Sequence, residues 1–173
     1  MIRSIHLVVG CAVALAFSAI AVTLTADDGV KTVQIRDDCD PATFNADPPA
    51  GPGLGHICDG NGDTTFGDFV AEIGATHAAE KWRFNPNNTN DTHLMALNRG
   101  GELHTFTHVA KFGGGEIPFL NSLSNNPDEV TECIGALGGN TALPPGATKT
   151  VDAKIGDHFQ CCVHPWMRLT VTR

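Results

Sequence analysis

Positive charge is scarce in this sequence. Its 173 residues include 11 Lys or Arg against 19 Asp or Glu, so the formal net charge is −8. A nucleic-acid-binding domain presents a basic surface, and this composition therefore argues against a nucleic-acid partner. It favours a cationic partner, or simply a soluble protein outside the cytoplasm.

Three sequence patterns are also missing. The chain has no internal repeat and no long low-complexity tract, and its length is that of one domain of ordinary size. It contains no C-x-x-C-H motif, so covalent attachment of haem is not expected.

The first 26 residues have the layout of a secretory signal. Arg3 is their only formal charge, an apolar run follows, and small residues precede two possible cleavage points, after Ala21 or after Ala26. We therefore predict a signal peptide over 1–26 and a single exported domain over 27–173, periplasmic or otherwise exported. Because the apolar run approaches the ~18 residues of a membrane span, a retained anchor is the alternative.

Five cysteines follow the predicted signal. An odd number in an oxidising compartment implies two disulfides and one thiol with another role, of which a metal-bound thiolate is the simplest. Cys39 and Cys58 bracket most of the segment 38–63, whose many Asp, Pro, Gly and Asn residues predict irregular structure. A disulfide between these two cysteines would tie that loop.

The hydrophobic pattern predicts mainly strands. Residues 30–36 alternate as a strand does, whereas the apolar residues of 64–80 have helical spacing, with Asp63 as the expected N-cap. From residue 81 onward, short strands are separated by Gly, Pro and Asn turns, which is typical of an antiparallel sandwich or barrel. The expected strands lie within 81–86, 92–101, 103–112, 144–162 and 167–173, with a long loop over 113–130.

The stretch "CCVHPWM" near the C-terminus carries a candidate metal site. Cys161, His164 and Met167 are spaced three residues apart, so a tight loop between two strands could bring their side chains together. A thiolate, an imidazole and a thioether suit a soft metal, and copper fits best, whereas zinc rarely binds methionine. A second histidine is needed from elsewhere, and His93, His104 and His108 all remain candidates.

These residues resemble the cupredoxins, the small blue copper proteins of the plastocyanin, pseudoazurin and amicyanin type. In that family an aromatic residue precedes C-x-x-H, a methionine and a final strand; here these are Phe159, Cys161, His164, Met167 and Leu169–Thr172. The first ligand histidine of the family follows a strand that ends in Asn and a glycine-containing turn. Asn98, Gly100, Gly101 and His104 have this layout, so the resemblance selects His104.

The resemblance covers residues 81–173 well and implies an all-β, Greek-key sandwich or barrel with one Cu(I)/Cu(II) ion. Residues 38–80 would be a loop-plus-helix insertion to which the resemblance gives no role. The implied ligands are His104, Cys161, His164 and Met167, with Asn98 steadying the ligand loops. If Cys161 is the ligand, Cys162 points to the other side of its strand and is free to pair with Cys133.

The implied function is that of an exported carrier of single electrons rather than an enzyme. His164 would be the exposed edge through which electrons pass, with Pro165 and Trp166 as an apolar contact rim. We expect a monomer that meets a redox partner protein, such as a basic cytochrome or an oxidoreductase, without stable membrane insertion after signal cleavage. A copper-binding protein for delivery without electron transfer is the alternative.

Overall fold

A computed structural model describes residues 29–46 and 55–173. The predicted signal peptide over 1–26 and part of the predicted loop over 38–63 lie outside these described residues. Within them, no helix is both long and apolar enough to cross a membrane.

The described residues include two four-stranded sheets. The first has β1 (Lys31–Arg36) and β4 (His93–Asn98) as parallel central strands, with β2 (Arg83–Asn85) and β8 (Thr148–Asp152) antiparallel at its edges. Successive residues alternate between the two faces of a strand; this is why Val33 and Ile35 of β1 and Leu94 and Ala96 of β4 are buried together.

The second sheet has the strand order β3 (Asn88–Thr89), β10 (Arg168–Val171), β9 (His158–Gln160) and β6 (Thr107–Val109). A separate pair joins β5 (His104–Thr105) to β7 (Ala142–Leu143). The fold is thus mostly β, as the sequence predicts, and the described sheets do not close into a barrel.

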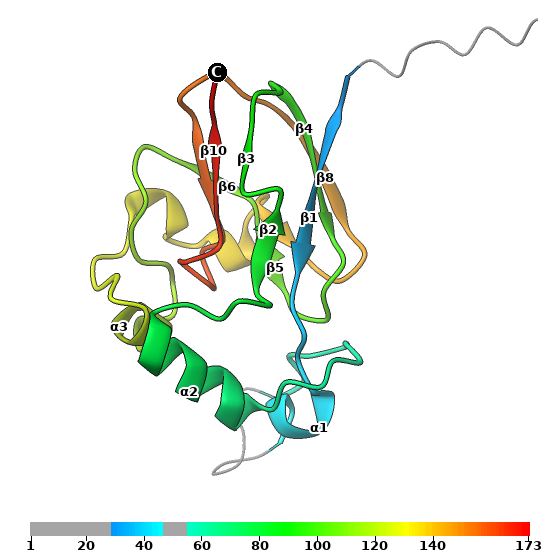
Figure 1. The fold of residues 1–173 in the computed structure, drawn as a ribbon, viewed down its shortest axis with the longest axis vertical. Coiled ribbons are helices and arrows are strands. Elements are labelled where there is room, and N and C mark those ends of the chain that lie inside the picture. The colour runs from blue at the N-terminus through cyan, green and yellow to red at the C-terminus, as the bar shows by residue number, and fades with distance from the viewer. Residues whose placement is uncertain (1–28, 47–54) are drawn as a thin grey trace, which may run out of the picture.

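The helical elements are short, apart from one. They are α1 (Pro41–Phe44), α2 (Phe66–Thr76), α3 (Pro118–Leu123) and the 3₁₀ turns η1 (Thr131–Cys133) and η2 (Ala136–Gly138). Figure 1 shows α1, α2 and α3 gathered at one end of the strands, opposite the end at which the chain finishes.

Three local predictions need correction. The N-cap of α2 is Thr65 rather than Asp63, because the Thr65 hydroxyl accepts a hydrogen bond from the Asp68 N–H at 3.1 Å. Helix α3 occupies part of 113–130, where Pro118 stands at the first helical position that proline favours. Helix α1 similarly begins at Pro41 within the predicted irregular loop.

The prediction of a single strand over 103–112 is also wrong. It is divided into β5 and β6, which pair with different strands: β5 with β7, and β6 with β9. This division separates the two histidines of the segment. His104 is fully buried, whereas His108 is exposed beside Asp157.

Helix α2 packs its apolar face against the end of the strands. Phe69 and Ile73 are buried, and the Phe69 ring lies 4.5 Å from Trp82 and 5.4 Å from Phe44, measured between ring centroids. The helix and Trp82 therefore form part of the same hydrophobic core as the strands.

Candidate metal centre

Three buried side chains converge where β5 meets the loop between β9 and β10. Cys161 Sγ lies 3.6 Å from His104 Nδ1 and 3.8 Å from His164 Nδ1, and the two Nδ1 atoms are 3.3 Å apart. All three side chains are fully or almost fully buried. The sequence-predicted set of one cysteine and two histidines is therefore brought together, with His104 as the second histidine.

The distances within this cluster suit a single metal ion. An ion bound ~2.0 Å from each nitrogen and ~2.3 Å from the sulfur, at angles of roughly 110–125°, separates these atoms by roughly 3.3–3.9 Å. The three observed distances fall in that range. Nδ1 is the facing atom in both histidines, so both rings turn the same nitrogen toward one point.

The loop 161–167 is closed by its own backbone. The Cys161 N–H donates to the Met167 carbonyl at 3.0 Å, and the Met167 N–H donates to the His164 carbonyl at 2.9 Å. A further N–H group, that of Thr105, points at Cys161 Sγ from 3.4 Å, as is favourable for a thiolate. Met167, the last residue of this loop, is buried in the hydrophobic core that also contains Cys161.

The adjacent cysteine has a different role. Cys162 forms a disulfide with Cys133, and Cys39 forms one with Cys58. Among the described cysteines, Cys161 is the one outside a disulfide. Both predicted pairings are thus present, and Cys161 and Cys162 point to separate clusters of buried residues.

Asn98 ties the turn before His104 to a neighbouring strand. Its side-chain amide donates to the carbonyls of Glu102 and Leu143, each at 2.8 Å, and its side-chain oxygen accepts from the Gly100 N–H at 2.9 Å. Leu143 pairs with His104 in the β5–β7 ladder. These bonds connect the turn before His104 to β7, while the role of Asn98 in steadying the ligand loops of a metal site stays a prediction.

Asp37, which the sequence did not indicate, contacts the far side of His104. Its carboxylate lies 2.7 Å from His104 Nε2 and also accepts the N–H groups of Gly101 and Glu102, at 2.9 and 3.1 Å. The approach needs glycine in the turn, because a Cβ added at Gly100 would stand 1.9 Å from the Asp37 carboxylate. The Asp37 side chain is only 2% exposed.

This contact makes a buried ion pair in the metal-free protein. Burial alone would raise the pKa of Asp37, but the hydrogen bond and charge of His104, with the two N–H groups, lower it to about 2. Burial alone would lower the pKa of His104, but the carboxylate of Asp37 and the thiolate of Cys161 raise it to about 10. Burial likewise opposes ionisation of Cys161, yet both histidines hold the pKa of its thiol well below the usual range.

A second carboxylate, Glu102, lies behind His164. Its Oε2 atom is 3.7 Å from His164 Nε2 and accepts a hydrogen bond from the indole N–H of Trp82. Burial raises the pKa of Glu102, although the charges of His164 and His104 act against this. Neither Asp37 nor Glu102 belongs to the C-x-x-H pattern. Their nearness in the sequence, of Asp37 to Cys39 and of Glu102 to His104, is the only signal that could have indicated that they lie at the site.

The prediction that His164 is an exposed edge is wrong. His164 is 1% exposed, and Pro165 is buried as well. The ring of Phe69 meets His164 edge-on at 6.1 Å, and Trp166, which is partly exposed, lies 5.4 Å from it. The reason is that α2, in the segment to which no role was assigned, covers the loop 161–167.

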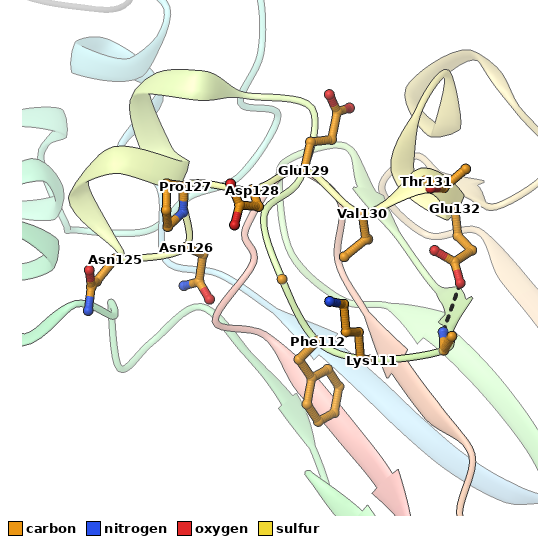
Figure 2. Close-up of a pocket in the computed structure, with 12 residues that line it drawn as sticks. Lys111, Phe112, Asn125, Asn126, Pro127, Asp128, Glu129, Val130, Thr131 and Glu132 are labelled. Carbon is orange, nitrogen blue, oxygen red and sulfur yellow. Dashed lines mark hydrogen bonds between the residues drawn. The ribbon is translucent and has the colours of Figure 1, made fainter.

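The remaining candidate histidines lie elsewhere. His93 and His108 are exposed and pair with Asp152 and Asp157, at 2.6 and 3.3 Å. A surface hollow of about 630 Å³ is lined by residues 110–113 and 125–132, all of them outside the Cys161 cluster. Figure 2 shows these lining residues. In the described residues, the chemistry of the site is therefore concentrated at the buried cluster.

Comparison with known proteins adds no identification: no protein-family model, curated protein or solved structure matches this chain.

Proposed function

We propose that this chain is an exported mononuclear copper protein of the type 1 class that transfers single electrons, built on a cupredoxin-like β-sandwich. The observation that carries the proposal is the buried triangle of His104 Nδ1, His164 Nδ1 and Cys161 Sγ. Two imidazoles and a thiolate, with a methionine as weak axial ligand, are the donor set of blue copper sites, and Met167 is buried at the end of the loop that carries Cys161 and His164.

The protein's own residues supply what such a site requires. His104, Cys161 and His164 would hold the ion, and Met167 would be the weak fourth ligand. Copper bound there would supply a one-electron couple. The N–H of Thr105 and the hydrogen bonds of Asn98 hold the ligand loops in place, so the ligands need to move little when the charge of the ion changes.

The burial of the ligands supports a single, well-defined site with water kept away. Phe69 and Trp166 cover His164, and the two disulfides fit an oxidising, exported environment. The partly exposed Trp166 is the side chain beside His164 that a redox partner protein could contact.

The test is the visible spectrum and electrochemistry of the copper-loaded protein. An intense sulfur-to-copper absorption at about 600 nm, with reversible one-electron cycling, is the expected result for this donor set. A colourless protein that binds only Cu(I), or one that does not cycle, would contradict the proposal.

Delivery of copper to another protein is the alternative function, and the burial of His164 argues against it. The ligands of an acceptor protein cannot reach a histidine that is 1% exposed, whereas an electron can cross the side chains that cover it. The two functions are separated by mixing the copper-loaded protein with a thiolate chelator of Cu(I). Delivery requires fast release of the ion, whereas an electron carrier retains it.

A further inference from the structure

The two ligand histidines share a feature that the ligand pattern does not require. Each presents Nδ1 to Cys161 and turns Nε2 toward a buried carboxylate, which is Asp37 for His104 and Glu102 for His164. The side chains of the two acids are 2% and 7% exposed. Two carboxyl groups are thus buried directly behind one candidate metal centre.

We propose that Asp37 and Glu102 are positioning residues that fix the orientation of the ligand histidines, and that the negative charge of Asp37 shifts the site toward divalent copper relative to monovalent copper. This inference rests on the proposed function for the identity of the metal. The effect of the two acids on the orientation of the histidine rings does not depend on copper and applies to any divalent ion that the cluster binds.

The position of the ring proton decides which nitrogen of a histidine can bind a metal. A neutral imidazole that binds a metal through Nδ1 carries its proton on Nε2, and the partner of that N–H decides which nitrogen faces the metal. At His104 this partner is Asp37 Oδ2, 2.7 Å away. Asp37 is itself held by two backbone N–H groups, from Gly101 and Glu102, so it cannot turn away from the ring at low cost.

Glu102 is held in a comparable way. Its Oε2 atom accepts the indole N–H of Trp82 and lies 3.7 Å from His164 Nε2, a looser contact than that of Asp37. Trp82 is itself fixed between Phe44 and Phe69 and accepts a hydrogen bond from Trp166 through its carbonyl, at 3.2 Å. We therefore expect Asp37 to have the larger effect of the two.

Burial also strengthens the effect of the charge on Asp37. A negative charge interacts much more strongly with a nearby ion in the protein interior than in water. Asp37 and the Cys161 thiolate both stabilise a bound cation, and they stabilise a doubly charged ion more than a singly charged one. Removing the charge of Asp37 should weaken Cu(II) binding more than Cu(I) binding, which raises the reduction potential.

The same residues give the segment 38–80 a function. Asp37 immediately precedes it, Trp82 follows it, and the Asp59 N–H donates to the Gly101 carbonyl at 2.7 Å. Phe69 of α2 supplies the cover over His164. On this view, the described residues of the segment exclude water from the two acid–histidine pairs and hold the acids against the histidines.

The experiment compares Asp37→Asn and Glu102→Gln with the wild type in the full chain. Asp152→Asn is the matched control, because Asp152 also contacts a histidine, His93 at 2.6 Å, but does so on the surface. Zn(II) is the first probe, since its binding does not depend on redox activity. Partners of metal-bound histidines typically contribute 10- to 100-fold in metal affinity.

We expect Asp37→Asn to lose Zn(II) affinity by about 10- to 100-fold, Glu102→Gln to lose less, and Asp152→Asn to match the wild type. In the copper-loaded proteins, a loss of Cu(II) affinity tenfold larger than that of Cu(I) raises the potential by about 59 mV. An Asp37→Asn protein with the affinity of Asp152→Asn would overturn the positioning role, and an unchanged potential would overturn the charge effect.

If Asp37→Asn does not fold, a measurement on the wild-type protein still tests the orientation of the two histidines. Nitrogen-15 NMR of the Zn(II)-loaded wild type should show Nδ1 of both histidines bound to metal and Nε2 protonated. Coordination of either histidine through Nε2 would overturn the proposal. Because these readouts use zinc, they stand apart from the proposed function, which fails instead if the copper-loaded protein is not blue or does not cycle.

Discussion

Two regions meet at the candidate metal centre, and they contribute in different ways. The loop 161–167 supplies Cys161 and His164, whose atoms face the same point. Residues 37–82 supply no atom of the Nδ1/Sγ triangle, yet they provide Asp37 behind His104 and Phe69 against His164. The comparison separates the donors of a site from its surroundings, which determine charge, access and orientation.

The two regions are also stabilised by different interactions. The loop is short and closed by its own backbone hydrogen bonds. The region 37–82 is long and needs the Cys39–Cys58 disulfide, close glycine contacts and an aromatic cluster to hold it against the strands. Substitutions in the loop should therefore change the ligand set, whereas substitutions in 37–82 should change what surrounds it.

The largest effect is expected from Cys161→Ser. A hydroxyl does not replace a soft thiolate as a ligand, so the absorption at about 600 nm should disappear and copper affinity should fall by orders of magnitude. Absorption and metal analysis of the copper-treated variant test this. Retention of the blue colour would show that the loop does not supply the thiolate ligand.

Phe69→Ala should strongly destabilise the region 37–82. Replacing a buried phenylalanine by alanine costs about 3–5 kcal/mol of the free energy of unfolding, and the space created would open His164 to solvent. We expect electron exchange with a small hydrophilic oxidant to become faster. Stopped-flow kinetics measure this, with Phe112→Ala, at the surface hollow in Figure 2, as the control. A slower exchange would indicate that the ring conducts electrons rather than shielding the site.

Asp37→Asn should destabilise the metal-free protein in a pH-dependent way. The lowered pKa of Asp37 contributes stability above about pH 3.8 that is lost as the pH falls through about 2. The raised pKa of His104 contributes stability below about pH 6.5 that is lost as the pH rises through about 10. The advantage of the wild type over the variant should therefore be greatest between about pH 4 and 6.5, at about 3–5 kcal/mol for a broken buried pair.

Denaturant unfolding of both metal-free proteins over pH 2–10 tests this expectation. Asp152→Asn again serves as the control, because its histidine contact lies on the surface. A difference between wild type and Asp37→Asn that does not change with pH would mean that Asp37 and His104 do not form an ion pair.

The smallest effect is expected from Thr65→Ala at the start of α2. Loss of the N-cap hydrogen bond to the Asp68 N–H should cost about 1 kcal/mol. The helix should still form, because its buried face is unchanged, and metal affinity should stay at the wild-type value. Chemical unfolding and a Zn(II) titration measure the two quantities. A large fall in affinity would mean that the position of α2 controls the ligands more closely than its contacts indicate.

Much of the fold could be predicted from local pattern. The alternation of 30–36 and the helical spacing of Phe66, Phe69, Val70 and Ile73 correspond to β1 and α2. The break between β5 and β6 could not be predicted, because Thr105 and Thr107 suit a continuous strand and the break comes from pairing with two different partners.

The candidate site likewise has a part that could be predicted from the sequence and a part that could not. Sequence spacing alone placed Cys161, His164 and Met167 on one short loop, and the odd number of cysteines indicated a thiol outside the disulfides; both follow from local geometry and from chemistry. Only the tertiary structure decided that Asp37 lies behind His104 and that Phe69 covers His164. These contacts join residues that are 67 or more positions apart, and their formation depends on how the whole chain packs.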